Sequence, residues 1–93
     1  MKLSILSNKP CCYVCGTTQN LHRHHCMFGT ANHRLADEDG LWIYLCAYHH
    51  TGDHGVHHDK NLNMRIKQDA QTAWEETYGD RQAFMRRYGK NYL

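Results

Sequence analysis

The chain contains no hydrophobic segment long enough to cross a membrane or to direct secretion. The apolar residues between Leu3 and Leu6 form a run that is too short and too interrupted for a signal peptide. No stretch reaches the ~20 apolar residues that a transmembrane helix needs. Internal repeats and low-complexity tracts are absent as well. We therefore expect a cytoplasmic protein that has no membrane partner.

The chain also lacks a strong net charge and an even number of cysteines. The formal net charge of +2 over 93 residues does not by itself indicate nucleic-acid binding. Five cysteines that include a Cys-x-x-Cys pair do not suit a disulfide framework. The nine histidines are mostly uncharged near pH 7 and able to bind metals. The composition predicts one small domain, of a size that often needs a bound metal for stability.

Two local motifs predict a closed zinc site. The first is Cys12-Tyr13-Val14-Cys15, which is followed by small residues that let the backbone turn tightly. The second is Cys46-x-x-His49, further along the chain. Thiolate and imidazole ligands at this spacing are typical of structural zinc. We predict that the ligands of a structural Zn²⁺ are Cys12, Cys15, Cys46 and His49. Cys11 could replace Cys12, although Cys12 has the usual spacing.

Other histidines predict a second, open metal site. Adjacent side chains leave the backbone in different directions, so His50 cannot easily share an ion with His49 and would face a second one. In the alternating segment 20–26 we expect at least one of His24 and His25 in a working site.

A histidine after His50 would complete this second ligand set, and two candidates remain open. His54 follows His50 by one helical turn, and His57 by two, so both would return to the same face of a continuous helix. Gly52 and Gly55 disfavour a long regular helix here.

The remaining pattern predicts an α+β fold class. The first two predicted elements are strands, the third is a helical turn and the last two are helices. They cover residues 20–26, 41–45, 46–58, 60–78 and 81–88. Segment 27–40 has a glycine near each end and is predicted to be a long loop, in which His33 is a solvated residue. The aromatic residues predicted to pack the helices onto the strands are Trp74, Tyr78, Phe84 and Tyr88.

This ordered set of motifs resembles the HNH endonucleases, and most of all their small phage-type members with a zinc knuckle. The matching pieces are Cys12-Tyr13-Val14-Cys15, His24-His25, Leu45-Cys46-Ala47-Tyr48-His49-His50 and a following histidine. The resemblance implies a single nuclease domain over residues 1–93. Within it, residues 11–58 would form a zinc-stabilised ββα-metal core, and residues 60–93 a helical extension.

The resemblance also implies a role for each matching residue. His24 and His50 would bind a catalytic ion together with His57 or His54. Gly55-Val56-His57 is similar to the phage members, and we lean to His57 because Gly52 and Gly55 weaken the helix that His54 would need. His25 would be the general base. The family's central Asn is missing just before the second strand, where this chain has Asp39-Gly40. Asn32 is the candidate for that role.

The function predicted in this way is metal-dependent hydrolysis of DNA phosphodiester bonds, in phage-related nucleic-acid processing or recombination. The catalytic divalent cation would be Mg²⁺, Mn²⁺, Ni²⁺ or Zn²⁺, although magnesium suits imidazole ligands less well. The cell would be a phage-infected or prophage-carrying bacterium. Duplex or branched DNA is the expected partner, alongside a homodimer or a phage or host recombination or packaging protein. The residues expected to contact DNA are Arg23, Arg34, Arg86, Arg87 and Lys90.

Two alternatives keep the zinc site but not the enzyme. One is a non-catalytic zinc-binding module that interacts with DNA or protein, and the other is a metal-handling protein. A nicking assay separates them from the nuclease, because all three would bind zinc.

Overall fold

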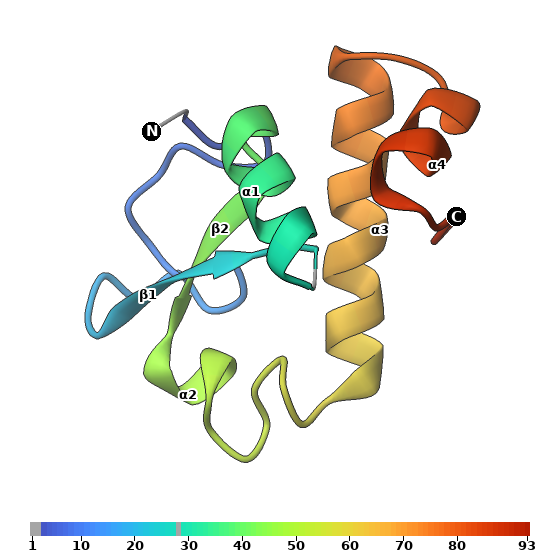
Figure 1. The fold of residues 1–93 in the computed structure, drawn as a ribbon. Helices are drawn as coiled ribbons and strands as arrows, with labels where there is room; N and C mark the ends of the chain where they lie inside the picture. The colour runs from blue at the N-terminus through green and yellow to red at the C-terminus, as the bar shows by residue number, and fades with distance from the viewer. Residues whose placement is uncertain (1–2, 28) are drawn as a thin grey trace.

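Two antiparallel strands form the sheet of the computed structural model. The model describes residues 3–27 and 29–93. Residues 1, 2 and 28 lie outside this description. All three belong to the predicted domain 1–93, and residue 28 also belongs to the predicted loop 27–40. Strand β1 (Leu21–His25) pairs with β2 (Trp42–Cys46), and His25 lies opposite Trp42 at the end of the pair (Figure 1). The α+β class and both predicted strands are confirmed.

The predicted loop between the strands is wrong, because its middle is a helix, α1 (Thr30–Asp39). The glycines that suggested a loop are the helix boundaries. Gly29 is the N-cap residue, and Gly40 closes the other end in the left-handed region with φ 74. A side chain at Gly40 would also collide with the backbone of Leu3. The residues between the two glycines include several good helix formers, so local propensity agrees with the structure.

Three further helices follow the sheet. Helix α2 (Ala47–His50) is a single turn, as the glycines after it lead one to expect. Helices α3 (Lys60–Thr77) and α4 (Arg81–Tyr88) confirm the two predicted C-terminal helices. The carboxylates of Asp59 and Asp80 accept hydrogen bonds from backbone N–H groups in the first turns of α3 and α4, which fixes where each helix begins. Helix α3 stands upright beside the sheet, and α4 packs against it (Figure 1).

The core joins the apolar strand β2 to one face of α3 and α4. Its fully buried members include Leu41, Ile43, Leu45, Ile66, Ala70 and Phe84. Trp74 and Tyr88 are also buried, as predicted. The prediction for Tyr78 is wrong, because its ring is 39% exposed and its hydroxyl donates to the backbone oxygen of Asp39 at 2.7 Å. Tyr78 is the C-cap residue of α3, and its ring lies 5.7 Å from that of the buried Trp74.

Asp39, at the end of α1, ties that helix to α3 and α4. Its carboxylate is 8% exposed and accepts hydrogen bonds from Trp74 Nε1 at 2.8 Å, Tyr88 Oη at 2.6 Å and Arg87 Nε at 2.6 Å. Burial, then the hydrogen bond to Asp39, raises the pKa of Tyr88. The same carboxylate raises the pKa of Arg87. A buried charge that accepts four hydrogen bonds, two of them from Arg87, is well compensated, so α1 has a fixed place in the fold.

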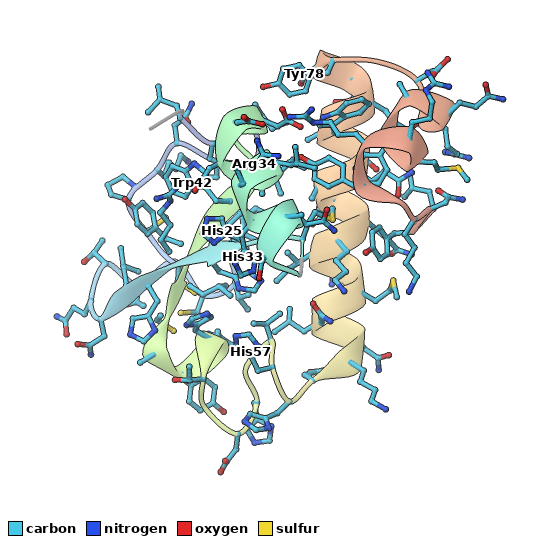
Figure 2. The ribbon with its side chains drawn as sticks, in the orientation of Figure 1. His25, His33, Arg34, Trp42, His57 and Tyr78 are labelled. Carbon is cyan, nitrogen blue, oxygen red and sulfur yellow. The ribbon has the colours of Figure 1, made fainter. Side chains whose placement is uncertain are left out.

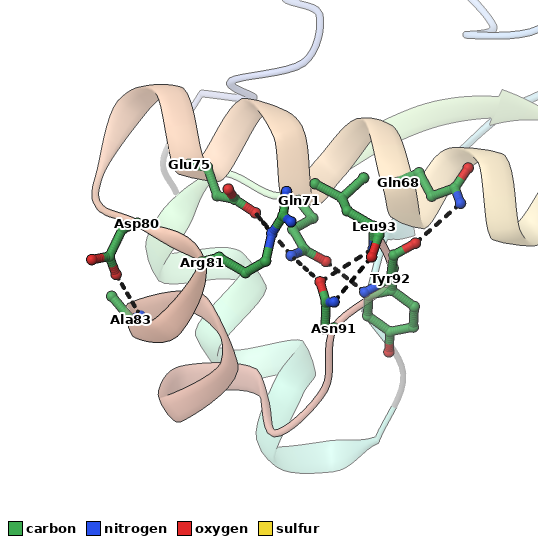
Figure 3. Close-up of polar contacts among 9 residues, drawn as sticks. All are labelled: Gln68, Gln71, Glu75, Asp80, Arg81, Ala83, Asn91, Tyr92 and Leu93. Carbon is green, nitrogen blue, oxygen red and sulfur yellow. Dashed lines mark hydrogen bonds and ion pairs between the residues drawn. The ribbon is translucent and has the colours of Figure 1, made fainter.

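The last residues are held against α3 by amide side chains (Figure 3). Buried Gln71 donates to Asn91 Oδ1 at 2.8 Å and accepts from the backbone N–H of Tyr92 at 2.7 Å. Gln68 donates to the carbonyl oxygen of Tyr92 at 3.0 Å.

In the part of the chain that the structure describes, no helix is both long and apolar enough to cross a membrane.

Candidate metal centres

The four residues predicted to form a closed site do come together. One ligand atom from each of Cys12, Cys15, Cys46 and His49 lies within 4.8 Å of all the others, so this cluster could hold a metal ion. Cys15 Sγ is 3.8 Å from Cys46 Sγ, and Cys46 Sγ is 3.3 Å from His49 Nδ1. With Zn–S bonds of about 2.3 Å, tetrahedral geometry places two sulfurs about 3.8 Å apart. The spacing therefore suits a tetrahedral ion.

Local backbone geometry positions these ligands. The Cys12–Cys15 turn closes with a hydrogen bond from Gly16 N to the Cys12 carbonyl at 2.9 Å, and Gly16 adopts a φ of 80 that favours glycine. The N–H of Tyr13 donates to the carbonyl of Tyr44 at 2.8 Å, which fastens the turn to β2. Cys46 ends β2 and His49 lies in the single turn of α2. The site thus joins the N-terminal turn, β2 and α2.

The environment of Cys12 favours a thiolate. Its burial opposes ionisation, but hydrogen bonds from the backbone N–H groups of Cys15, Cys46 and Val14 outweigh it and lower the pKa of the Cys12 thiol to about 6. All five cysteines are free thiols. Cys11 is not part of the cluster, so the structure favours Cys12 over Cys11 as the ligand.

A second cluster consists of His24, His50 and His57. Their ligand atoms also lie within 4.8 Å of one another, and His50 Nε2 is 3.3 Å from His57 Nε2. The ring centroids of His24 lie 5.3 Å from His50 and 5.7 Å from His57. His24 is 4% exposed, His50 is half-buried and His57 is exposed. This histidine cluster has a closed side at β1 and an open side toward solvent.

The chain after α2 explains why His57 joins the histidine cluster and His54 does not. The N–H of Val56 donates to the carbonyl of His49 at 2.8 Å, so the backbone folds back under the helical turn. A Cβ at Gly55 would lie 2.9 Å from the carbonyl of His50, so only glycine fits this close approach. His57 then lies beside His50, whereas the ring of His54 lies 5.9 Å from that of Tyr48.

Two members of the histidine cluster have lowered pKa values, which favours the binding of a cation. Burial, followed by the neighbouring imidazoles of His50 and His57, lowers the pKa of His24 to about 3. Burial, followed by His57 and His22, lowers the pKa of His50. Neutral imidazoles present lone pairs, so both residues are ready to bind a metal near neutral pH.

A cavity of about 240 Å³ opens next to the histidine cluster. It is lined by Arg23, His24, His25, His33, His50 and His57. His25, the last residue of β1, stacks on His33 of α1 with the rings 4.7 Å and 16° apart (Figure 2). His57 reaches the cavity from the turn below (Figure 2). His33 is exposed, as predicted, but the predicted loop is wrong at this residue, because His33 lies on helix α1 and lines the cavity.

Asp37 of α1 holds His25 in place and was missed in the sequence. Its Oδ1 lies 2.9 Å from His25 Nε2, and the guanidinium of Arg23 pairs with the same oxygen. The hydrogen bond from His25 is the main cause of the lowered pKa of Asp37. Asn32, predicted for this orienting role, does not line the cavity. The spacing of His33 and Asp37 would have indicated one shared face if α1 had been recognised as a helix.

The residues predicted to contact DNA differ in their exposure and in their ion pairs. Arg34, Arg86 and Lys90 are exposed, although Arg34 Nη1 lies 3.6 Å from Glu38. Arg23 is held by Asp37 and lies 4.8 Å above the Trp42 ring. Arg87 is bound by Asp39 and Glu38, so its guanidinium serves the fold.

Comparisons with known proteins found no relative of this chain. A scan against protein-family models found no match, and searches of curated proteins and of solved structures found none either.

Proposed function

We propose that this protein is a metal-dependent DNA endonuclease of the HNH type, with a ββα-metal core formed by β1, β2 and α2. One observation carries the proposal. A cluster of three histidines, open on one side, lies in the same cavity as a fourth histidine that is hydrogen-bonded to a carboxylate. Metal-assisted hydrolysis requires an ion that keeps open coordination positions, next to a general base that is held in a fixed orientation.

The histidine cluster would hold the catalytic ion. His24, His50 and His57 supply imidazole nitrogens, which suit Zn²⁺, Ni²⁺ or Mn²⁺ better than Mg²⁺. A bound divalent cation would neutralise charge on the phosphate and assist the leaving oxygen. The cluster of Cys12, Cys15, Cys46 and His49 would hold a structural Zn²⁺, and the adjacency of His49 and His50 would make the second site depend on the first.

His25 would act as the general base. Asp37 accepts a hydrogen bond from Nε2 of its ring, which leaves Nδ1 to take a proton from an attacking water. The water oxygen bonds to phosphorus as the bond to the 3′-oxygen breaks, and that oxygen gains a proton from solvent. The products are a 5′-phosphate and a 3′-hydroxyl. His33, stacked on His25, restricts the tilt of the base.

The exposed cations would position the nucleic acid without reading its sequence. Arg34 lies on the exposed side of α1, close in sequence to His33 of the cavity wall. Arg86 and Lys90 lie on and just after α4 and are free to approach a phosphate backbone. A phage-infected or prophage-carrying cell remains the setting that the resemblance suggests, with recombination or packaging proteins as partners.

A nicking assay on supercoiled plasmid tests the proposal. Protein is stripped of metal, given one equivalent of zinc and then supplied in turn with Mn²⁺, Ni²⁺, Zn²⁺ or Mg²⁺. Wild type should nick the plasmid, and His25→Ala should lose about 10²- to 10⁴-fold in rate, the contribution of a general base. His58→Ala, a change at an exposed histidine outside the cavity, is the matched control and should nick at the wild-type rate.

Two results would contradict the nuclease. One is equal nicking by wild type and His25→Ala, which would indicate a contaminating enzyme or another base. The other is no nicking with any cation while the histidine cluster binds metal, which would favour a non-catalytic zinc-binding interaction module.

A further inference from the structure

His22 has no role in the proposed chemistry, yet it touches the histidine cluster. It lies on β1 two residues before His24, on the same face of the strand, and is half-buried. Its Nδ1 is 2.9 Å from Nδ1 of His50, and the two rings meet edge-on at 81°. This distance is that of a hydrogen bond between the two imidazoles.

The two ring nitrogens of His50 therefore face different neighbours. Nε2 is turned toward Nε2 of His57, inside the histidine cluster, and Nδ1 is turned toward His22. A neutral imidazole has one N–H donor and one lone pair, so a choice of tautomer decides which side can bind a cation. The lone pair must be on Nε2 if His50 is to serve the cluster.

We propose that His22 is a positioning residue that sets this tautomer. Nδ1 of His22 accepts a hydrogen bond from Nδ1–H of His50, which leaves the Nε2 lone pair of His50 directed at a divalent cation shared with His24 and His57. Metal-binding histidines commonly donate their second N–H to a hydrogen-bond acceptor, which fixes ring orientation and ligand basicity. This inference rests on the ion site of the proposed function, although not on cleavage.

The geometry argues against His22 as a fourth ligand. It faces the nitrogen of His50 on the far side of the ring from His57, and it is not among the residues whose ligand atoms converge. Lone pairs on the two nitrogens of one imidazole diverge, so a cation bound at Nε2 of His50 lies beyond the reach of the nitrogen of His22 that faces Nδ1.

The test is a titration with Co²⁺ of protein that already carries one equivalent of zinc. His22→Phe keeps an aromatic ring and removes the acceptor, whereas His22→Gln keeps an acceptor oxygen. Loss of a hydrogen bond of this kind should weaken Co²⁺ binding by about 10- to 100-fold in His22→Phe. His22→Gln should recover most of this loss. The visible Co²⁺ spectrum should keep its shape in both, because the inner ligands are unchanged.

Two controls frame the titration. His57→Ala removes an inner ligand and should change the spectrum itself. His54→Phe replaces an exposed histidine outside the histidine cluster and should bind Co²⁺ like wild type. Zinc content and the thermal midpoint of each variant show that the first metal site and the fold are intact, and His22→Ala replaces His22→Phe if the larger ring disturbs the strand.

Each other outcome overturns the proposal. Equal Co²⁺ affinity of wild type, His22→Phe and His22→Ala would mean that His22 does not position His50. A spectrum altered as in His57→Ala would make His22 a direct ligand. A weak His22→Gln with no recovery would point to packing instead. Because the readout is affinity and not cleavage, an inactive wild type would defeat the nuclease proposal and leave this result standing.

Discussion

Adjacent residues serve different sites in this protein. His49 belongs to the cysteine cluster, formed by Cys12, Cys15, Cys46 and His49, whereas His50, the next residue, belongs to the histidine cluster. His24 is a candidate ligand, and His25, the next residue, is hydrogen-bonded to Asp37 on the other side of the strand. Neighbouring side chains point in different directions, so each pair of adjacent histidines contributes to two different groups of residues.

Asp37 should control the efficiency of His25 and not the binding of DNA or metal. Asp37→Asn weakens the hydrogen bond that orients the imidazole, so kcat should fall by about 10- to 100-fold, part of the ~10²–10⁴ that a general base supplies. KM and Co²⁺ affinity should remain close to wild type. Steady-state nicking rates provide this comparison, with Glu76→Gln on the exposed face of α3 as control. A rise in KM at constant kcat would contradict the positioning role.

The ligands could be predicted from sequence to the extent that their geometry is local. Cys12 and Cys15 share one turn, and Cys46 and His49 share another, so spacing alone identified them. The choice of His57 over His54 depends on how the chain folds back at Gly55, which is a contact with the backbone of His50 and leaves no periodic pattern. Asp37 was not found either, because its contact with His25 joins β1 to α1, and α1 was predicted to be a loop.

At the scale of elements, α1 shows why one helix was missed. Its glycine boundaries are typical of both loops and helix ends, and only Ala36 and Asp39 of the helix are buried. Few apolar residues face the core, so helical periodicity is weak. What fixes α1 is a buried carboxylate bound by donors from α3 and α4, a long-range arrangement that the sequence does not display.

The contact between Asp39 and Tyr88 should make stability depend on alkaline pH. The pKa of Tyr88 is raised in the folded protein, so the unfolded chain loses its phenol proton first, near pH 10. This contribution is present below pH 10 and is lost as pH rises toward the folded pKa. Urea unfolding between pH 7 and 11 should show a smaller alkaline loss for Tyr88→Phe than for wild type.

The neutral-pH result completes that prediction. Tyr88→Phe removes one of the four hydrogen bonds to the Asp39 carboxylate, so the free energy of unfolding at pH 7 should fall by about 1 kcal/mol. Tyr48→Phe, at a residue that is 55% exposed, is the matched control and should follow the wild-type curve. Parallel alkaline curves for wild type and Tyr88→Phe would show that Tyr88 ionises equally in both states.

At the scale of the whole molecule, the cysteine cluster brings together residues that lie far apart in the sequence. It links the N-terminal turn to the end of β2 and to α2, and α2 in turn presents His50. A chain of 93 residues buries a limited core, so an ion bound at this cluster would add a substantial share of its stability. Loss of a ligand from the cysteine cluster should therefore weaken metal binding at the histidine cluster, whereas loss of the exposed His57 should leave the fold and the cysteine cluster intact.

Removing one thiolate tests this dependence. Cys12→Ser should lower the zinc stoichiometry, and it should lower Tm by roughly 20 °C or more for a domain of this size. It should also weaken Co²⁺ binding at the histidine cluster. His57→Ala should lose the Co²⁺ site while it keeps one zinc and a nearly unchanged Tm, because His57 is exposed. Cys11→Ser, next to the cluster but outside it, is the control. A Cys12→Ser protein with one zinc and wild-type Tm would show that the ligand assignment is wrong, whereas intact Co²⁺ binding without zinc would show that the histidine cluster is independent.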